Sequence, residues 1–158
     1  MSFEKASAWL NERGYGDRII VPEQSSATVE LAAAAIGVEP DMIAKTMSFL
    51  LGDSAILILT SGLARTDNRK FKDTFQTKAK MVPFDQVEDL VGHAPGGVCP
   101  FGAKDGLPVY LDVSLKKHDT VYPACGDDHS AVRLGVDELE SLLSATWVDV
   151  CKDPPPAE

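Results

Sequence analysis

Lys45 is the first residue of this chain whose type and place suggest chemistry. It lies inside an apolar run, Met42 to Leu50, with hydrophobic neighbours on both sides. Burying an ammonium group is costly unless the side chain extends to the surface or meets an anionic or carbonyl oxygen in a pocket. Spacing alone favours the extended side chain. The pocket alternative would make Lys45 a residue that stabilises negative charge on a substrate.

A glycine-rich loop at 96–102 is the second candidate. Its glycines relieve steric limits on the backbone, and its proline fixes one φ angle. Such a loop can point consecutive backbone N–H groups at one oxygen, as acyl transfer requires, although a tight surface turn has the same composition. Its spacing does not match dinucleotide- or phosphate-binding loops. The loop consists of Gly96, Gly97, Val98, Cys99, Pro100, Phe101 and Gly102.

The cysteines and histidines suggest two further candidate sites, a nucleophile with its base and a metal site. Cys99 could be a nucleophile with His93 as its base, but nothing in the sequence indicates a lowered thiol pKa, so we favour Cys99 as a residue lining a pocket. Cys125, His129 and His118 could be metal ligands, yet the residues around His129 are typical of a turn. We therefore predict no metal and no cofactor.

The charge of the chain is unevenly distributed. The net charge of -9 argues against nucleic-acid binding, which needs cations against phosphates. Between residues 65 and 80, however, six basic residues stand against two acidic ones. A solvated helix face is the common explanation for such a run. The basic residues are Arg65, Arg69, Lys70, Lys72, Lys78 and Lys80.

The elements that must position these residues follow from periodicity and capping signals. Helices are predicted from Ser2 to a stop at Gly14, and at 29–36, 67–75, 83–91 and 137–143. Strands are predicted at 18–22, 43–51, 55–60, 78–82, 107–113, 120–123, 131–134 and 146–150. Without strict βαβ alternation, this order indicates a single α+β domain with a mixed sheet over residues 1–151. The Pro-rich residues 152–158 are expected to form a disordered tail.

Composition predicts a cytoplasmic protein. No stretch approaches the roughly 20 apolar residues of a membrane span, and the first residues lack the features of a signal peptide. Three cysteines without a CxxC spacing indicate free thiols.

Taken in order, several segments resemble the YbaK and prolyl-tRNA synthetase-associated editing domains. The resemblance runs from about residue 26 to residue 150, and the ordered set of a KT strand, a GGxxPFG loop and a PVxxD strand is specific. The segments are Ile43-Ala44-Lys45-Thr46, residues 55–59, the helix with Asp67 and Arg69-Lys70, residues 97–102, Pro108-Val109-Tyr110-Leu111-Asp112, Val121-Tyr122 and residues 134–149.

The resemblance implies an α+β fold with a curved, partly barrel-like mixed sheet, and a trans-acting deacylase that removes the wrong amino acid from tRNA. It places Lys45 near the terminal adenosine and the ester carbonyl, and the amides of Gly97, Val98, Cys99 and Pro100 around the aminoacyl group. Water would attack, assisted by a ribose hydroxyl. Substrate contacts are expected from Thr28, Thr46, Gly96, Phe101, Gly102, Ala124, Cys125 and Gly126, and tRNA contacts from Arg65, Arg69, Lys70 and Lys72.

The chain departs from the family pattern around the expected amino-acid pocket. Thr28 stands where members that clear cysteine have an aromatic residue, Ala131 where they have an acidic one, and Ala124 where they have a hydroxyl. These departures argue against a pocket specific for cysteine and could suit alanine, serine or a similar small side chain. The predicted substrate is tRNA(Pro) carrying a small amino acid such as alanine, serine or cysteine. The alternative is a non-catalytic module of the same fold that binds tRNA or a synthetase. The expected partners are the acceptor end of aminoacyl-tRNA and an aminoacyl-tRNA synthetase, with no membrane contact.

Overall fold

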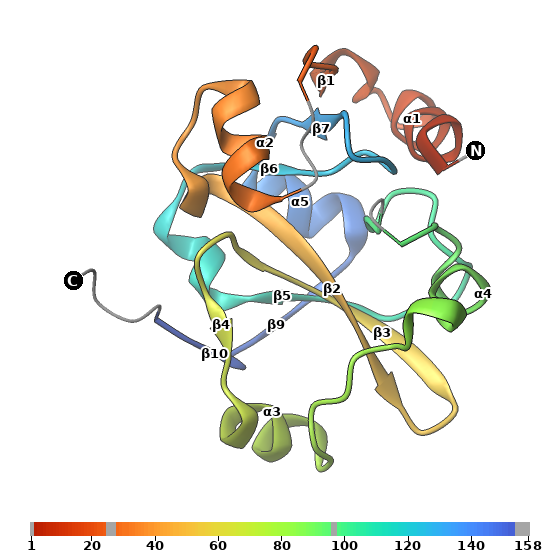
Figure 1. Cartoon of the computed structure of the whole chain (residues 1–158), viewed down its shortest axis with the longest axis vertical. Coiled ribbons are helices and arrows are strands. Elements are labelled where there is room, and N and C mark those ends of the chain that lie inside the picture. Colours follow the sequence, from red (N-terminus) through yellow and green to blue (C-terminus); the bar gives the residue numbers. More distant parts are fainter. Residues whose placement is uncertain (1, 25–27, 96–97, 154–158) are drawn as a thin grey trace.

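The computed structural model describes residues 2–24, 28–95 and 98–153 of the chain (Figure 1). The α-helices are α1 (Ser2–Glu12), α2 (Val29–Ile36), α3 (Asn68–Phe75), α4 (Val87–Val91) and α5 (Val136–Leu143). Short 3-10 helices lie at Gly16–Arg18, Pro40–Met42, Phe84–Gln86 and Val113–Lys117. The strands are β1 (Ile19–Ile20), β2 (Ile43–Leu51), β3 (Ser54–Ser61), β4 (Arg65–Thr66), β5 (Val109–Asp112), β6 (Thr120–Pro123), β7 (Ala131–Val132), β8 (Leu134–Gly135), β9 (Thr146–Val148) and β10 (Cys151–Lys152).

A curled sheet of six strands, in the order β8-β6-β2-β3-β5-β9, forms the centre of the fold. The pairs β2–β3 and β6–β8 are antiparallel, whereas β2–β6, β3–β5 and β5–β9 are parallel. Two small antiparallel pairs, β1–β7 and β10–β4, stand beside it. This arrangement confirms the predicted α+β domain with a curved mixed sheet.

The hairpin of β2 and β3 is the longest paired unit, and its alternation fixes which residues face each side. Lys45 pairs with Thr60, and Gly52 turns the chain with a positive φ of 62°. On one face Phe49 packs against Phe71 of α3, with ring centroids 4.9 Å apart. On the other face Ala44 belongs to the main core cluster, together with residues of α5. Alternation puts Lys45 on the same face as Phe49.

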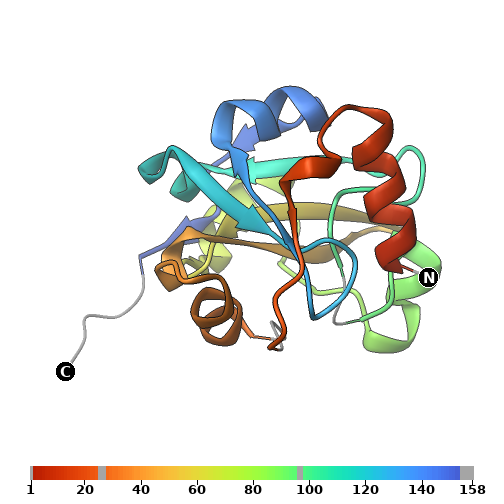
Figure 2. The same ribbon diagram turned by 90° about the horizontal axis from the view of Figure 1, so that it is seen from above.

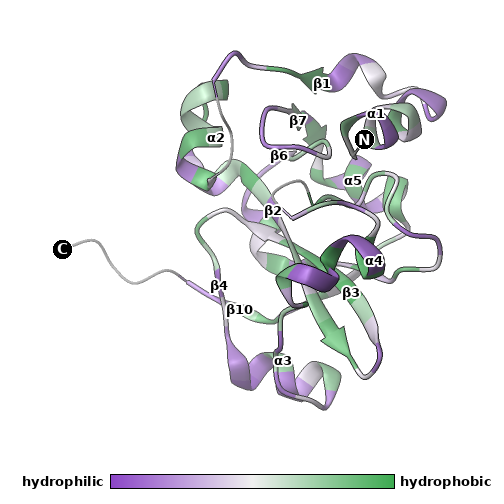
Figure 3. Ribbon diagram, turned by 45° about the vertical axis from the view of Figure 1, so that its right-hand side comes forward, coloured by the Kyte–Doolittle hydropathy of each residue, from purple (hydrophilic) through white to green (hydrophobic). Residues whose placement is uncertain are grey.

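Helices cover both sides of this sheet. Figures 1 and 2 show α2 and α5 on opposite sides of the long strands. In Figure 3 the ribbon of β3 is hydrophobic along most of its length, and that of α3 is largely hydrophilic. The colours agree with the burial of β3 from Ala55 to Ser61 and with the single buried residue of α3, Phe71.

The structure corrects three predictions at the sheet margins. The strand predicted at 78–82 is wrong, because only an isolated bridge between Met81 and Phe49 forms there. The strand predicted at 131–134 is divided into β7 and β8, which pair with different strands. Lys152 was placed in the disordered tail, but it pairs with Arg65 in the β10–β4 ladder. Residues 154–158 of the predicted tail lie outside the described residues.

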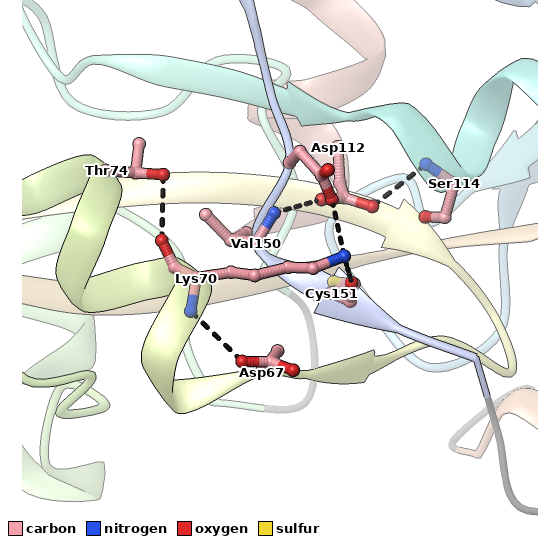
Figure 4. Close-up of polar contacts among 8 residues, drawn as sticks. Asp67, Lys70, Thr74, Asp112, Ser114, Val150 and Cys151 are labelled. Carbon is pink, nitrogen blue, oxygen red and sulfur yellow. Dashed lines mark hydrogen bonds and ion pairs between the residues drawn. The ribbon is translucent and has the colours of Figure 1, made fainter.

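Asp112 ties the C-terminal strands to the sheet. Its side chain is 1% exposed. Its Oδ1 accepts a hydrogen bond from Val150 N at 2.8 Å, and its Oδ2 accepts one from Ser114 N at 2.9 Å. Beside it, Lys70 donates to Cys151 O at 2.9 Å and pairs with Asp149 at 3.1 Å (Figure 4). Both oxygens of the buried carboxylate are thus used by backbone amides.

Candidate functional site

A cavity of about 130 Å³ opens where the pairing of β2 with β6 ends. The two strands are paired only at Ile43–Tyr122 and Ala44–Pro123. After β6 the chain leaves the sheet and enters the turn that leads to β7. Val29 and Ala32 of helix α2 line the cavity. Helix α2 lies beside the start of β2 (Figure 1). The lining residues are Thr28, Val29, Ala32, Ile43, Ala44, Lys45, Thr46, Tyr122, Ala124, Asp127, Ser130 and Ala131.

Lys45 is the basic residue among those that line this cavity. Its side chain is half-buried, and Nζ donates a hydrogen bond of 2.6 Å to the carbonyl oxygen of Ala64, in the loop between β3 and β4. Burial lowers the pKa of Lys45 below its usual value, and nearby Arg65 lowers it further. The Lys45 ammonium therefore ends against a backbone carbonyl oxygen, whereas spacing alone favours a side chain that extends to the surface. A cation held in this way is positioned to stabilise negative charge on a bound oxygen.

Asp41 holds the loop that carries the Ala64 carbonyl. One carboxylate oxygen, Oδ2, lies 2.8 Å from His118 Nε2 and 3.1 Å from Lys117 Nζ, and Oδ1 accepts from Leu63 N at 3.2 Å. The backbone carbonyl of Asp41 accepts from Gly62 N. Asp41 thus links the start of β2, the β3–β4 loop and the end of the 113–117 helix, and this link places the partner of Lys45.

Asp41 should make the stability of the protein depend on pH in the acid range. Burial alone would raise its pKa, but hydrogen bonds from His118, Lys117 and Leu63 outweigh that effect and lower the pKa to about 2. Because the folded pKa lies below the unfolded value, the stabilisation is present above about pH 4 and is lost as the pH falls toward 2. The shift corresponds to about 2 kcal/mol of unfolding free energy.

Urea unfolding at several pH values between about 5 and 2 measures this contribution. The matched variant is Asp41→Asn, which keeps the shape and removes the charge. We expect its unfolding free energy to be lower at neutral pH and to depend less on pH below 4. Identical pH profiles for the two proteins would contradict the assignment.

Three of the predicted substrate residues line the cavity besides Lys45. Thr28 caps α2, with its Oγ1 accepting from Leu31 N at 3.1 Å, and Ala124 follows β6. Thr46 has a buried Oγ1 that meets no hydrogen-bond partner among the described residues. An unpaired buried hydroxyl costs free energy. The Thr46 hydroxyl is therefore an unsatisfied polar group beside the cavity.

The glycine-rich loop is packed into the core over its described part, residues 98–102. Val98 is packed against the cluster of α4, and Cys99 and Phe101 are fully buried in the main core. Gly102 has a φ of 69°, and a Cβ there would lie 2.9 Å from the Lys5 carbonyl oxygen, so glycine is needed for the contact with α1. Gly97, predicted as a catalytic residue, and Gly96, predicted to bind substrate, lie outside the described residues.

We expected Cys99 to line a pocket, but it does not belong to the residues that line the cavity. Its Sγ does lie 3.6 Å from His93 Nε2, the pair drawn as nucleophile and base. Both side chains are 0% exposed, however, and burial raises the pKa of the Cys99 thiol far above its usual value. A buried protonated thiol is a poor nucleophile. The structure therefore favours a packing role for Cys99.

Cys125 and Gly126, two further predicted substrate residues, are buried behind the cavity wall. Cys125 belongs to the main core, and the backbone of Gly126 hydrogen-bonds the sulfur of Cys99. His118, drawn earlier as a metal ligand, is paired with Asp41. Within the described ranges, no three potential metal-binding side chains gather at one place.

The predicted tRNA-binding residues lie in β4 and α3, and none of them lines the cavity. Arg65 follows Ala64 directly, and Arg69, Lys70 and Lys72 belong to α3. Arg65, Arg69 and Lys72 are exposed. Lys70 is engaged by Asp149 and the Cys151 carbonyl, so its ammonium is less available to an external phosphate.

Sequence reasoning missed two polar cavity residues, Asp127 and Ser130. They belong to the turn between β6 and β7, which composition marked only as a turn. The Asp-x-x-Ser spacing could have indicated a side-chain hydrogen bond within that turn. That spacing could not indicate that the turn lines the same cavity as Lys45.

The sequence of this chain is similar to those of several known proteins. Residues 23–142 match a family model described as "Aminoacyl-tRNA editing domain". The uncharacterized protein YwhH of Bacillus subtilis (strain 168) is 52% identical over 133 residues, which cover 83% of this chain and 85% of YwhH. The proline–tRNA ligase of Shouchella clausii (strain KSM-K16) is 28% identical over 132 residues, or 79% of this chain but only 22% of the ligase.

A solved structure gives the same picture of the fold. It is described as a "putative trans-editing enzyme for prolyl tRNA synthetase" and is 31% identical, with a TM-score of 0.87 over 96% of this chain and 97% of that one. In the part of the chain that the structure describes, no helix has the length and hydrophobicity needed to cross a membrane.

Proposed function

We infer that this chain, which belongs to the aminoacyl-tRNA editing domain family, is a trans-acting deacylase that acts in the cytoplasm on mischarged tRNA. The substrate that we propose is tRNA(Pro) carrying a small amino acid such as alanine, serine or cysteine. The observation that carries the proposal is Lys45, a half-buried lysine fixed by the Ala64 carbonyl, among the residues that line a small cavity.

The proposed reaction is hydrolysis of the ester between the amino acid and the terminal ribose. Water adds to the ester carbonyl, the C–O bond to the ribose breaks, and the ribose oxygen leaves with a proton. The Lys45 ammonium stabilises the oxyanion, and amides of the glycine-rich loop assist. Among the described residues no exposed cysteine is present to attack. An ester is already activated, so positioning and charge stabilisation can support hydrolysis.

The size of the cavity supports a small aminoacyl group. Its volume of about 130 Å³ is well below the roughly 300–1,000 Å³ of pockets for drug-sized ligands. Thr28, Ala32 and Ala124 contribute short side chains to its wall. Size selection between neighbouring amino acids is worth only about 1–3 kcal/mol per methylene, so we expect several small amino acids to be accepted.

The tRNA would approach over the basic residues that follow the β3–β4 loop. Arg65 lies one residue from the carbonyl that holds Lys45, and α3 adds Arg69 and Lys72. Binding through such contacts should weaken as salt rises. A relative such as the Shouchella clausii proline–tRNA ligase matches this chain over part of its length, which supports a synthetase as a further partner.

The alternative function is a non-catalytic module that binds tRNA or a synthetase. Ala124 and Ala131, two of the departures from the family pattern, both line the cavity and leave it with fewer polar groups. A module of this kind would bind charged tRNA and release no amino acid.

A deacylation panel separates the two functions. One tRNA(Pro) is charged in turn with alanine, serine, cysteine, threonine and proline, and release of the amino acid is followed with and without the protein. We expect release of at least one small amino acid at a rate well above that of cognate prolyl-tRNA(Pro). Binding without release on every substrate would support the non-catalytic module.

A further inference from the structure

We infer that Asp127 binds the α-ammonium group of the aminoacyl ester, so that this chain hydrolyses esters of free amino acids and spares N-acylated ones, including peptidyl esters. The inference rests on the proposed deacylase function and names a residue that selects its substrate. Asp127 belongs to no segment that carried the family resemblance. Its role is inferred from its place among the residues that line the cavity.

The turn holds the Asp127 carboxylate in a fixed position. Oδ1 accepts a hydrogen bond of 2.6 Å from Ser130 Oγ and one of 3.0 Å from His129 N. Ser130 is only 1% exposed, so its hydroxyl is a buried anchor for the carboxylate. Fixing one oxygen in this way limits rotation of the side chain and orients the other oxygen.

The second oxygen is available to a ligand. Oδ2 of Asp127 has no hydrogen-bond or ion-pair partner among the described residues. Asp127 is also the only carboxylate among the residues described as lining this cavity. A half-buried carboxylate with one unpaired oxygen favours a cationic ligand.

The charges of the cavity wall match those of an aminoacyl ester. Lys45 and Asp127 are the two charged residues among the described residues that line the cavity, and they lie on different elements. In the substrate, the α-ammonium and the carbonyl carbon are separated by one carbon atom. A carbonyl oxygen turned toward Lys45 leaves the ammonium to face the opposite charge. The two residues together would orient the ester for attack.

N-acylation removes both features that this arrangement recognises. The amine loses its positive charge when it becomes an amide, and an acetyl group adds three heavy atoms that the cavity of about 130 Å³ must accommodate. The carboxylate of Asp127 would then face a neutral group in place of a cation. Sites built for a charged hydrogen bond discriminate strongly against analogues that lack it.

The test compares alanyl-tRNA(Pro) with N-acetyl-alanyl-tRNA(Pro) at about pH 6.5, where the α-amine is protonated. We expect the wild-type chain to hydrolyse the free-amine ester with a kcat/KM at least about 100-fold higher. Asp127→Asn keeps an oxygen for Ser130 and His129 and removes the charge. We expect it to lose about 10- to 100-fold on the free-amine ester and little on the acetylated one.

Asp128→Asn is the matched control. The Asp128 carboxylate is next in sequence, lies 2.6 Å from the exposed His129 Nδ1, and does not line the cavity. We expect this variant to keep the wild-type preference. Equal hydrolysis of both esters by the wild-type chain, or an equal loss on both esters in Asp127→Asn, would overturn the role of Asp127 and leave the deacylase function standing.

A binding measurement keeps the inference testable if no ester is hydrolysed. A tRNA acceptor-stem helix with alanine in a non-hydrolysable amide linkage is compared with its N-acetyl form. Tighter binding of the free amine, lost in Asp127→Asn, would support Asp127 even where the deacylase function fails. Equal affinities for the two forms would overturn it.

Discussion

Replacement of Lys45 by methionine is expected to lower kcat/KM for deacylation by at least about 100-fold without unfolding the protein. The reason is that Lys45 lines the cavity and its half-buried ammonium is held 2.6 Å from the Ala64 carbonyl oxygen, so no other cation among the described lining residues can replace its charge. Methionine has a similar length and fills the same space. Single-turnover deacylation of alanyl-tRNA(Pro) by wild type and variant measures the loss.

Two controls accompany the Lys45 variant. One measures its stability, and the other removes a different lysine. Removing a half-buried ammonium also removes its desolvation cost, so the unfolding free energy should change little. Lys104→Met removes a lysine that lies outside this cavity and whose Nζ donates to the Asp89 carbonyl at the surface. It should deacylate at the wild-type rate. Full activity of Lys45→Met would remove Lys45 from the mechanism.

Local signals predicted the elements that surround the cavity. Helix α2 occupies residues 29–36 as expected, because Thr28 caps its start and Gly37 ends it in the left-handed conformation. Asp67 caps α3 in the same way. The apolar run of β2 has its predicted bounds, because strand periodicity and the turn at Gly52 are both local properties of the chain.

Contacts between distant segments could not be read in this way. Strands β4 and β10 have two residues each and exist only because they pair with one another across the fold. The carboxylates of Asp41 and Asp127 have ordinary sequence surroundings. Their importance arises because the first meets His118, 77 residues away, and the second shares a cavity with Lys45.

The glycine-rich loop shows a second limit of sequence reasoning. Its composition was compatible with a binding loop and with a turn, and the family resemblance favoured binding. In the described residues Cys99 and Phe101 belong to the main core, so part of the motif is explained by packing. The unusual composition of a motif can therefore reflect close packing beside a site as well as contact with a substrate.

Asp112, the acidic residue of the PVxxD strand, has the environment of a structural residue. Asp112→Ala is expected to lower the unfolding free energy by about 3 kcal/mol or more, because it leaves the amides of Ser114 and Val150 buried without an acceptor. Urea unfolding followed by circular dichroism measures the loss. The slope of the transition should stay near that of the wild type.

Two further variants separate the buried carboxylate from its surface neighbours. Asp149→Ala removes an exposed partner of Lys70 and should change stability little, because surface ion pairs contribute little. Asp112→Asn keeps one acceptor oxygen but turns an amide group toward the second N–H, so it should be intermediate. If Asp112→Ala were as stable as Asp149→Ala but inactive, the carboxylate would act on the substrate and not on the fold. The expected order therefore distinguishes a motif residue that builds the sheet from one that performs the chemistry.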